Sequence, residues 1–458
     1  MPTVMKFGGT SVADAHAFEN VARIVASQQS AAPVVVVSAM SGVTDALLAA
    51  TVAAGEGHPV EAIASLAETF HRHHQTAAEL LTSTAAQGFT KQVDNAAHQI
   101  NELLRISAVD PPRRRPTQDA VLAYGETLSS ELLAELLNER GTMAKHVDAR
   151  RCILTDDDYT CALPLLPDTL FKAHDTLVPI VQNGFVPVLG GFIASTAEGT
   201  TTTLGRGGSD YTAALIGAAL GVDEIQIWTD VTGVLTADPR VVPAAQTIER
   251  LSYAEASELA YFGAKVLHPK TIQPAIEGRI PVRICNSRAS EQIGTLVGPE
   301  TETTQRTIKA IAHKSGVTTV QITSARMLGA YGFLRALFEV FERHKTVVDV
   351  VATSEVSVSL SLDDASALPV IVTELEQLGT VRVEKGCAIV CVVGEGLRGT
   401  PGIAARVFSA ISDINVTLIS QGASSINFTF AIEEEHVEEA VKRLHAEFFE
   451  GRYDGSRQ

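Results

Sequence analysis

Short apolar runs that stop at glycine or at a small polar residue recur through the first part of the chain. They occupy residues 4–7 (with Lys6), 34–37, 186–189, 225–228 (with Gln226) and 282–284 (with Arg283). Runs without regular polar alternation are typical of parallel strands covered on both faces. Between the first two runs, Phe18, Val21, Ala22 and Val25 recur at helical spacing. Strands that alternate with helices predict a doubly wound, mainly parallel α/β sheet.

The residues that end these runs are the first indication of a ligand site. They are Gly8-Gly9, Ser38, Gly190-Gly191 and Thr229-Asp230. The carboxyl ends of parallel strands share one edge of a sheet, and ligands of such sheets bind beyond that edge. We therefore expect these residues to gather around a ligand.

The C-terminal part contains a duplication. After a polar stretch, TETTQRT at 301–307, three pairs of residues match at one constant offset: Gly329/Gly399, Gly332/Gly402 and Phe338/Phe408. Each copy predicts a βαββα unit plus a closing strand, a split-βαβ domain. The predicted domains are 1–297, 298–386 and 387–458, and the last two can exchange strands.

Composition excludes several classes of protein. The formal net charge of −17 argues against nucleic-acid binding, which needs a basic face. No apolar run reaches the length of a membrane span, and the first residues lack a secretory-signal pattern. The five cysteines lack C-x-x-C spacing and are expected to be free thiols. We expect a cytoplasmic protein that contacts neither nucleic acid nor membrane.

The stretch KFGGTSV at 6–12 places Lys6 in a strand, just before a Gly-Gly turn. Glycines allow backbone N–H groups to approach a phosphate, and Lys6 adds a full positive charge. The structural alternative is a lysine that reaches solvent from a strand end.

The stretch GRGGSD at 205–210 surrounds Arg206 with three glycines. Arginine is suited to bidentate recognition of a carboxylate. We predict that Ser209 is the N-cap of the next helix and that Asp210 lies in its first turn. A capped helix with a surface arginine is the alternative, but it leaves the three glycines unexplained.

Other polar residues are ambiguous when taken alone. Glu126, in YGE, is predicted in the first turn of a helix that ends at Gly141, where a structural role is the commoner one. Arg240 and Lys265 would each be ordinary surface charges. The HRHH run at 71–74 predicts a solvated helix face rather than a metal site.

Taken together, these motifs resemble those of the aspartate kinases in the amino-acid-kinase family, of the monofunctional, lysine-sensitive type. The motifs are KFGGTSV at 6–12, SGVTD at 41–45, YGE at 124–126, TTTLGRGGSDYTAAL at 201–215, WTDVTGVLTADPR at 228–240 and FGAKVLHP at 262–269. The duplicated C-terminal unit is similar to that family's paired ACT domains.

The resemblance implies ATP-dependent phosphorylation of the β-carboxylate of L-aspartate to 4-phospho-L-aspartate. This is the first step toward lysine, threonine, methionine and diaminopimelate. Lys6 and Asp210 would be catalytic, and aspartate would be bound by Ser38, Thr44, Glu126, Arg206 and Ser209. ATP would be bound by Lys6, Gly8, Gly9, Thr229, Asp230, Leu235, Arg240 and Lys265. Mg²⁺ would be carried by the ATP phosphates, without a protein metal site. Leu235 departs from the tyrosine of many relatives.

The resemblance also implies regulation by an end-product amino acid, with lysine as the first candidate. The matching effector positions are Met327, Ala330, Val348, Asp349, Thr353, Ser354 and Glu355. Ala330 replaces a serine of lysine-sensitive relatives, so an altered lysine response is the alternative. Asp349 and Glu355 could instead be simple turn-flanking acids. The ACT domains would form a homodimer or homotetramer.

Two rival functions fit the sequence less well. Another kinase of the family, acting on glutamate, acetylglutamate, carbamate or UMP, fits the KFGGTS opening and the ACT pair less well. A non-catalytic amino-acid sensor would be expected to lose Lys6, Glu126, Arg206 or Asp210, and all four are present. Because a carboxylate with a pKa of about 3.9 is already ionised at neutral pH, no general base is required.

Overall fold

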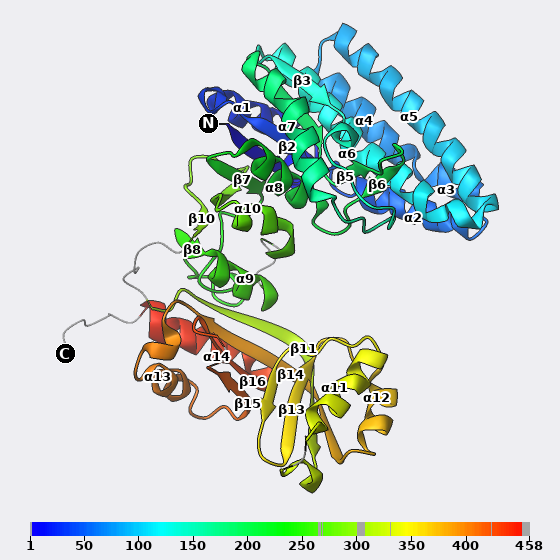
Figure 1. The fold of residues 1–458 in the computed structure, drawn as a ribbon. Helices are drawn as coiled ribbons and strands as arrows, with labels where there is room; N and C mark the ends of the chain where they lie inside the picture. The colour runs from blue at the N-terminus through cyan, green and yellow to red at the C-terminus, as the bar shows by residue number, and fades with distance from the viewer. Residues whose placement is uncertain are drawn as a thin grey trace. The chain divides into compact units, whose positions relative to one another are not determined.

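The computed structural model describes residues 2–263, 267, 269–299, 307–329, 331–422 and 424–450. The chain forms two compact units (Figure 1). The first unit comprises Met1–Val234, Glu249–Tyr253 and Val266–Thr301, and the second comprises Leu235–Ile248, Ala254–Lys265 and Glu302–Gln458. The predicted boundary at 297/298 therefore does not coincide with this division, because two earlier segments also belong to the second unit.

The first unit is built on an eight-stranded sheet with the order β3-β4-β2-β1-β7-β9-β10-β8. The neighbouring strands β3, β4, β2, β1, β7 and β9 are parallel, whereas β10 is antiparallel to β9. The strands are β1 Thr3–Phe7, β2 Val34–Val37, β3 Ala144–Val147, β4 Val186–Gly190, β7 Glu224–Thr229, β8 Arg250–Ser252, β9 Val282–Asn286 and β10 Thr295–Gly298. The five apolar runs form β1, β2, β4, β7 and β9, and the predicted mainly parallel sheet is confirmed.

Helices cover this sheet. Helix α1 (Ala15–Ser27) begins after Asp14, whose carboxylate accepts a hydrogen bond from the Ala17 N–H at 2.9 Å. Its buried face includes the four apolar residues predicted from their spacing. Helices α7 (Leu166–Gln182) and α8 (Gly208–Leu220) pack against each other, and α8 also contacts β1 and β7. A short hairpin of β5 (Ile193–Ser195) and β6 (Thr201–Thr203) leads into α8. Helix α10 (Gln273–Glu277) also contacts α8.

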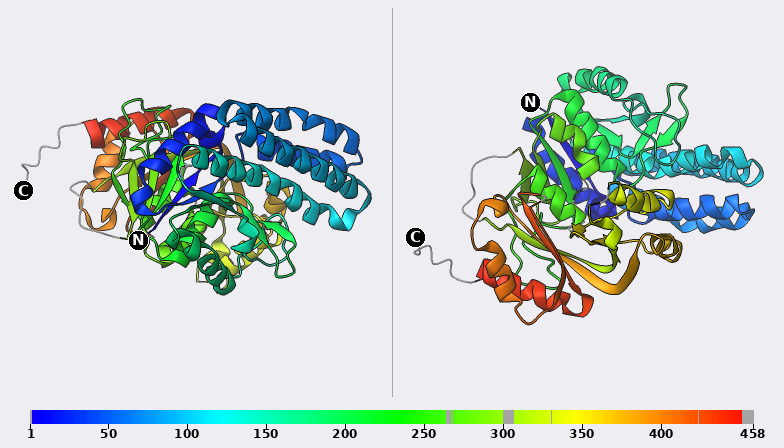
Figure 2. Two further views of the ribbon diagram at one scale, coloured as in Figure 1. Left: turned by 90° about the horizontal axis from the view of Figure 1, so that it is seen from above. Right: turned by 60° about the horizontal axis from the view of Figure 1, so that its bottom comes forward.

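Five helices form a bundle beside the sheet: α2 Val43–Gly55, α3 Pro59–Ser65, α4 Ala67–Leu80, α5 Ser83–Val109 and α6 Arg114–Glu139. The long helices α4, α5 and α6 run side by side in Figures 1 and 2. Helix α6 is buried on most of its circumference, because it packs against both the bundle and β4.

The bundle corrects one prediction about the histidine run. His71 is exposed as expected, but His73 is fully buried on the inner face of α4. Its Nδ1 lies 2.7 Å from the Thr69 carbonyl oxygen and donates a hydrogen bond to it. Burial lowers the pKa of His73 to about 4, so its imidazole is neutral. The prediction failed because helical spacing does not show how many helices pack around α4.

The second unit contains a six-stranded antiparallel sheet with the order β12-β13-β11-β14-β16-β15. Its strands are β11 Ala310–Thr323, β12 Val351–Thr353, β13 Ser357–Leu362, β14 Thr380–Val393, β15 Val416–Gln421 and β16 Asn427–Glu433. Helices α11 (Phe333–Arg343) and α12 (Leu368–Leu375) form one core with the sheet, and α13 (Ile403–Ala410) and α14 (Val437–His445) form another. The two helix pairs lie at opposite ends of the sheet (Figure 1).

The two C-terminal repeats are joined by their longest strands. The second half of β11 pairs with β13, while its first half pairs with the end of β14 beside β16. Likewise, the first half of β14 completes the sheet of the first repeat. Each repeat thus takes its closing strand from the other, and the predicted boundary at 386/387 falls inside β14. Within the described residues, no helix has both the length and the apolar character needed to cross a bilayer.

Candidate active site

The loops that follow the central strands are held together by backbone hydrogen bonds. Ser38 N–H donates to the last carbonyl of β1 at 3.0 Å, and Gly191 N–H donates to the last carbonyl of β2 at 2.8 Å. Gly8 N–H donates to the Trp228 carbonyl of β7 at 3.0 Å. The expected gathering of these residues at one edge is therefore observed. However, the Gly8 N–H is occupied by Trp228 and does not point freely toward a phosphate.

Lys6 and Asp210 meet at this edge. The Lys6 Nζ lies 2.7 Å from Asp210 Oδ1, and the two side chains are only 12% and 18% exposed. Lys6 comes from the central strand, and Asp210 comes from the first turn of α8, as predicted. A carboxylate at this distance fixes the position of the ammonium group.

The start of α8 differs from the prediction for Ser209. Gly207, with φ of +75°, is the N-cap, no side chain caps the helix, and Ser209 lies one residue inside it. A Cβ on Gly207 would lie 2.7 Å from the Thr271 methyl group, so both the backbone angle and the space require glycine. Ser209 instead packs tightly on the turn after β4, where a Cβ on Gly191 would lie 2.7 Å from the Ser209 Cβ.

Glu126 also occupies a different position from the predicted one. It lies well inside α6, which begins at Arg114, and not in a first turn. The glycine before it does not start the helix. A Cβ on Gly125 would lie 2.8 Å from the Ala39 Cβ, so this glycine allows α6 to approach the loop after β2. Helix α6 also lies close to the end of β4, since a Cβ on Gly190 would lie 3.0 Å from the Glu126 backbone.

Burial dominates the electrostatics of Glu126. Glu126 is only 3% exposed. Burial raises the pKa of its carboxyl group to about 8, although a hydrogen bond from the Ala39 backbone and the charge of Lys6 both act to lower it. Among the described residues, its Oε2 has no hydrogen-bond partner. A buried carboxyl oxygen without a partner is a site that a ligand ammonium group can satisfy.

Three further predicted residues lie on loops or helix starts around this edge. Arg206 is exposed on its glycine-flanked loop and forms no ion pair within the described part of the chain. Ser38 is half-buried directly after β2. Thr44 is half-buried in the first turn of α2.

The predicted nucleotide residues fall into two groups. Thr229 ends β7, and its hydroxyl donates to Asp230 Oδ1 at 3.2 Å. Leu235 and Arg240 belong to the second unit, where the Arg240 Nη2 is held 2.6 Å from Asp238. The Leu235 backbone forms an isolated antiparallel β-bridge with Thr247. Lys265 lies outside the described residues.

Ser287 is a polar residue of this edge that the sequence analysis missed. It follows β9, is 5% exposed, and accepts a hydrogen bond from the Ser11 hydroxyl at 2.8 Å. Its own hydroxyl donates to the Thr229 carbonyl at 3.1 Å. The available signal was its place just after an apolar run, the same signal that identified Ser38.

In the second unit, the predicted effector residue Asp349 belongs to a polar cluster. The Tyr261 hydroxyl, at the end of α9 (Tyr253–Tyr261), donates to Asp349. The Lys314 ammonium pairs with Asp363 and lies 4.9 Å from the centroid of the Tyr261 ring. Burial, together with the neighbouring Asp363, raises the pKa of Asp349.

The other predicted effector positions lie around the first repeat. Ser354 forms a 2.7 Å hydroxyl–hydroxyl bond with Ser357 in the turn between β12 and β13. Thr353, at the end of β12, and Glu355 are exposed. Met327 and Val348 pack against the core under α11 and α12, and Ala330 lies outside the described residues.

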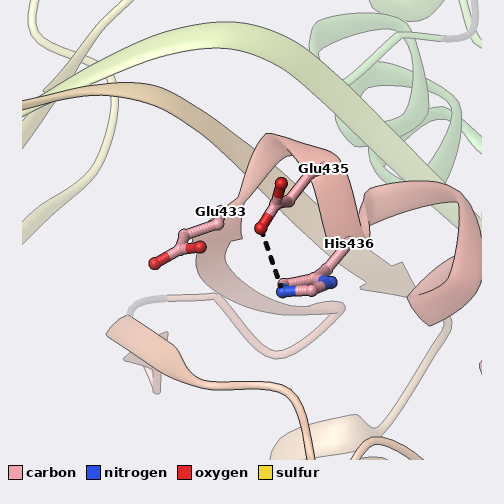
Figure 3. Close-up of side chains that lie close together, drawn as sticks. All are labelled: Glu433, Glu435 and His436. Carbon is pink, nitrogen blue, oxygen red and sulfur yellow. Dashed lines mark ion pairs between the residues drawn. The ribbon is translucent and has the colours of Figure 1, made fainter.

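A group of possible metal ligands occurs elsewhere in the second unit. Glu433, Glu435 and His436 lie together before α14, with His436 Nε2 3.6 Å from Glu435 (Figure 3). Both carboxylates are exposed, and solvated clusters of this kind are common without a metal. This cluster adds nothing to the site around Lys6.

Comparison with known proteins identifies the family. The model of the amino acid kinase family matches residues 1–286, and an ACT domain model matches residues 390–448. Lysine-sensitive aspartokinase 3 of Escherichia coli strain K12 is 37% identical over 455 residues, covering 98% of this chain and 99% of that protein. The chain belongs to the aspartokinases. The chloroplastic aspartokinase 3 of Arabidopsis thaliana is 39% identical over 463 residues, covering 98% of this chain and 81% of that protein.

Solved aspartokinase structures share the fold. The structure of E. coli aspartokinase III with aspartate and ADP, in the R-state, has a TM-score of 0.81 and 36% identity, covering 98% of this chain and all of that one. The T-state structure of the same enzyme with lysine and aspartate has a TM-score of 0.82 and 37% identity, covering 98% and 99%. The fold of this aspartokinase is thus that of a kinase domain with paired ACT domains.

Proposed function

We propose that the protein transfers the γ-phosphoryl group of ATP to the β-carboxylate of L-aspartate, forming 4-phospho-L-aspartate. The observation that carries this proposal is the Lys6–Asp210 ion pair at the carboxyl end of the central strand, close enough to Glu126 for the Lys6 charge to lower its pKa. This arrangement places one fixed cation beside a buried acid that can accept an ammonium group. Both are needed to bring an amino acid and a triphosphate together.

The chemical obstacle is the repulsion between two anions, because the attacking carboxylate is already ionised. Lys6 would neutralise the phosphoryl group, and Asp210 would hold its ammonium in place. A unit charge at ~4 Å in an effective dielectric of about 20 is worth about 4 kcal/mol. That corresponds to roughly three decades of rate. Mg²⁺ would arrive with ATP as part of the nucleotide substrate.

Recognition of aspartate would use opposite charges at its two ends. Glu126 would accept the α-ammonium group, and Arg206 would bind a carboxylate in a bidentate manner. Ser38, Thr44 and Ser209 would complete the pocket. The close packing at Gly190 and Gly191 brings the turn after β4 against Glu126 and Ser209.

The nucleotide would be bound beside β1 and β7. Gly9, Thr229 and Asp230 would contact it there, and Gly8, whose N–H is used by Trp228, would allow its close approach. The motif resemblance also assigns Leu235, Arg240 and Lys265 to nucleotide binding, and that assignment stays a prediction. Since leucine at 235 offers no polar side chain, contact there would be through the backbone.

We also propose feedback control by an end-product amino acid, with lysine as the first candidate. Asp349 supports this, because its carboxyl group lies half-buried beside a second acid and could neutralise a cationic ligand. The ACT repeats would mediate a homodimer or homotetramer. All five cysteines are free, which fits the reducing cytoplasm where we propose that the enzyme works.

The test is ADP release with aspartate, glutamate, acetylglutamate or carbamate as acceptor, followed by trapping of the acyl phosphate with hydroxylamine. Aspartate is expected to be strongly preferred, with inhibition by lysine. Preference for another acid would support a different carboxylate kinase. A protein that binds amino acids without releasing ADP would be a sensor.

A further inference from the structure

A second buried acid on α6 lies two helical turns before Glu126. Asp119 is completely buried, and its carboxylate accepts hydrogen bonds from three different donors. The Thr160 N–H lies 2.9 Å from Oδ2, the Thr203 N–H lies 3.1 Å from Oδ2, and the Thr203 hydroxyl lies 2.7 Å from Oδ1. Nothing in the proposed chemistry uses this carboxylate directly.

Its partners hold the loop that carries Arg206. Thr203 is the last residue of β6, immediately before Leu204 and the glycine-flanked arginine. Thr160 lies against the other side of the loop, because a Cβ on Gly205 would be 3.3 Å from the Thr160 carbonyl oxygen. One carboxylate therefore fixes both the strand that enters the loop and the segment on which the loop rests.

The backbone around this loop is strained. Thr160 and Phe192 have φ values of +76° and +68°, which are unusual for residues other than glycine. The Phe192 carbonyl accepts the Leu204 N–H at 3.0 Å, and its ring would lie 2.7 Å from a Cβ on Gly208. Such conformations persist where the surroundings dictate them, and they concentrate at functional sites.

Helix α6 connects this anchor to the substrate. Asp119 and Glu126 are seven residues apart, so they lie on the same face, about 10.5 Å apart along the axis. One rigid helix therefore carries both the proposed acceptor of the substrate ammonium and the anchor of the Arg206 loop.

We propose that Asp119 is a positioning residue that sets the distance between Arg206 and Glu126 and thereby selects an amino acid of the length of aspartate. This inference rests on the proposed function. A purely structural role for Asp119 would change stability but would affect the KM for aspartate and the KM for ATP alike.

The test compares Thr203→Val with Thr203→Ser. Valine has nearly the shape of threonine, but its side chain cannot donate to Asp119 Oδ1, whereas serine keeps the hydroxyl. The backbone N–H of residue 203 can donate to Oδ2 in both variants. We expect Thr203→Val to raise the KM for aspartate roughly tenfold, the loss typical of a hydrogen bond to a charged acceptor, and to leave the KM for ATP within about twofold. Thr203→Ser should behave like the wild type. Asp119→Asn should raise the KM for aspartate further and reduce the preference for aspartate over glutamate.

Glu224→Gln is the matched control, since it breaks the 2.8 Å pair with Arg283 in the same sheet. It should lower the melting temperature without separating the two KM values. Equal effects of Thr203→Val on both KM values, or none, would overturn the proposal.

Hydrogen exchange at residues 204–208 gives a readout that does not depend on the substrate. Faster exchange there in Thr203→Val, with the rest of the unit unchanged, is expected. Unchanged exchange would overturn the positioning role even if the wild type proved to act on another acid. Failure of the wild type to phosphorylate aspartate would instead refute the proposed function.

Discussion

The binding of aspartate should strengthen as the pH rises from about 6 to 8, because Glu126 must lose its proton to hold an ammonium group. Burial raises the pKa of Glu126 to about 8. At pH 7 only about one molecule in ten therefore carries the charged form. The kcat/KM for aspartate should accordingly be about tenfold lower at pH 7 than its limiting value, and binding should release nearly one proton.

The assay is a pH profile of kcat/KM for aspartate with ATP saturating, together with proton release measured by calorimetry in buffers of different ionisation enthalpy. Glu126→Gln should abolish the rising limb and weaken binding. Glu131→Gln is the matched control on the same helix. Burial and the charges of Asp148 and Glu135 raise the pKa of Glu131 to about 7, but it has no proposed contact with substrate, so its variant should keep the limb. A flat profile in the wild type would refute the reasoning.

The same ionisation has a consequence for stability. The pKa of Glu126 is higher in the folded protein than its ordinary value of 4.5. The contribution of this proton to stability is therefore complete below pH 4.5 and is lost as the pH rises toward 8. The melting temperature of Glu126→Gln relative to the wild type should rise over that interval. A difference that stays constant with pH would contradict the assigned pKa.

Three other outcomes are expected. Lys6→Met should lower kcat by roughly three decades in single-turnover experiments. Adding Asp210→Asn should cost little more activity and should restore stability, because Lys6→Met alone leaves the Asp210 carboxylate without its partner. Near-normal turnover of Lys6→Met would exclude the proposed role of Lys6. Asp349→Asn should weaken lysine inhibition at least tenfold without changing kcat, and Tyr261→Phe should keep lysine binding, as measured by inhibition and calorimetry; an unchanged response of the Asp349 variant would remove it from the effector site. The free energy of unfolding of the wild type, measured in urea, should fall as the pH drops from 6.5 toward 4, because the pKa of His73 is about 4 in the folded protein and 6.5 ordinarily. His73→Phe should flatten that pH dependence. Identical slopes for the two proteins would argue against the lowered pKa of His73.

Local sequence patterns were sufficient for the parallel sheet and for the types of residue at its edge. Short, mainly apolar runs that end at glycine or a polar residue favour buried strands of this length, so β1, β2, β4, β7 and β9 were predictable from local sequence order. The small and polar residues after those runs then predicted the edge at which Lys6 and Asp210 meet. The three glycines around Arg206 likewise indicated more than a capped helix, and the structure shows that a Cβ on Gly207 or Gly208 would clash.

Patterns failed where the environment comes from distant segments. The YGE glycine resembles a helix start, but its real constraint is the loop after β2, which touches it from another part of the chain. The His73 position depends on how many helices surround α4. The residue type of Ser209 predicts a helix cap, but the cap is Gly207, because the tight space beside Thr271 and the left-handed backbone require glycine there.

The sequence by itself therefore determined which segments are buried and which chemical groups are available, because periodicity and residue type are local properties. Only the tertiary structure decided which groups meet. It paired Lys6 with Asp210 and moved the pKa of Glu126 by removing it from water. It also exchanged β11 and β14 between the repeats. These outcomes depend on distances between segments far apart in the chain, and no local pattern specifies such distances.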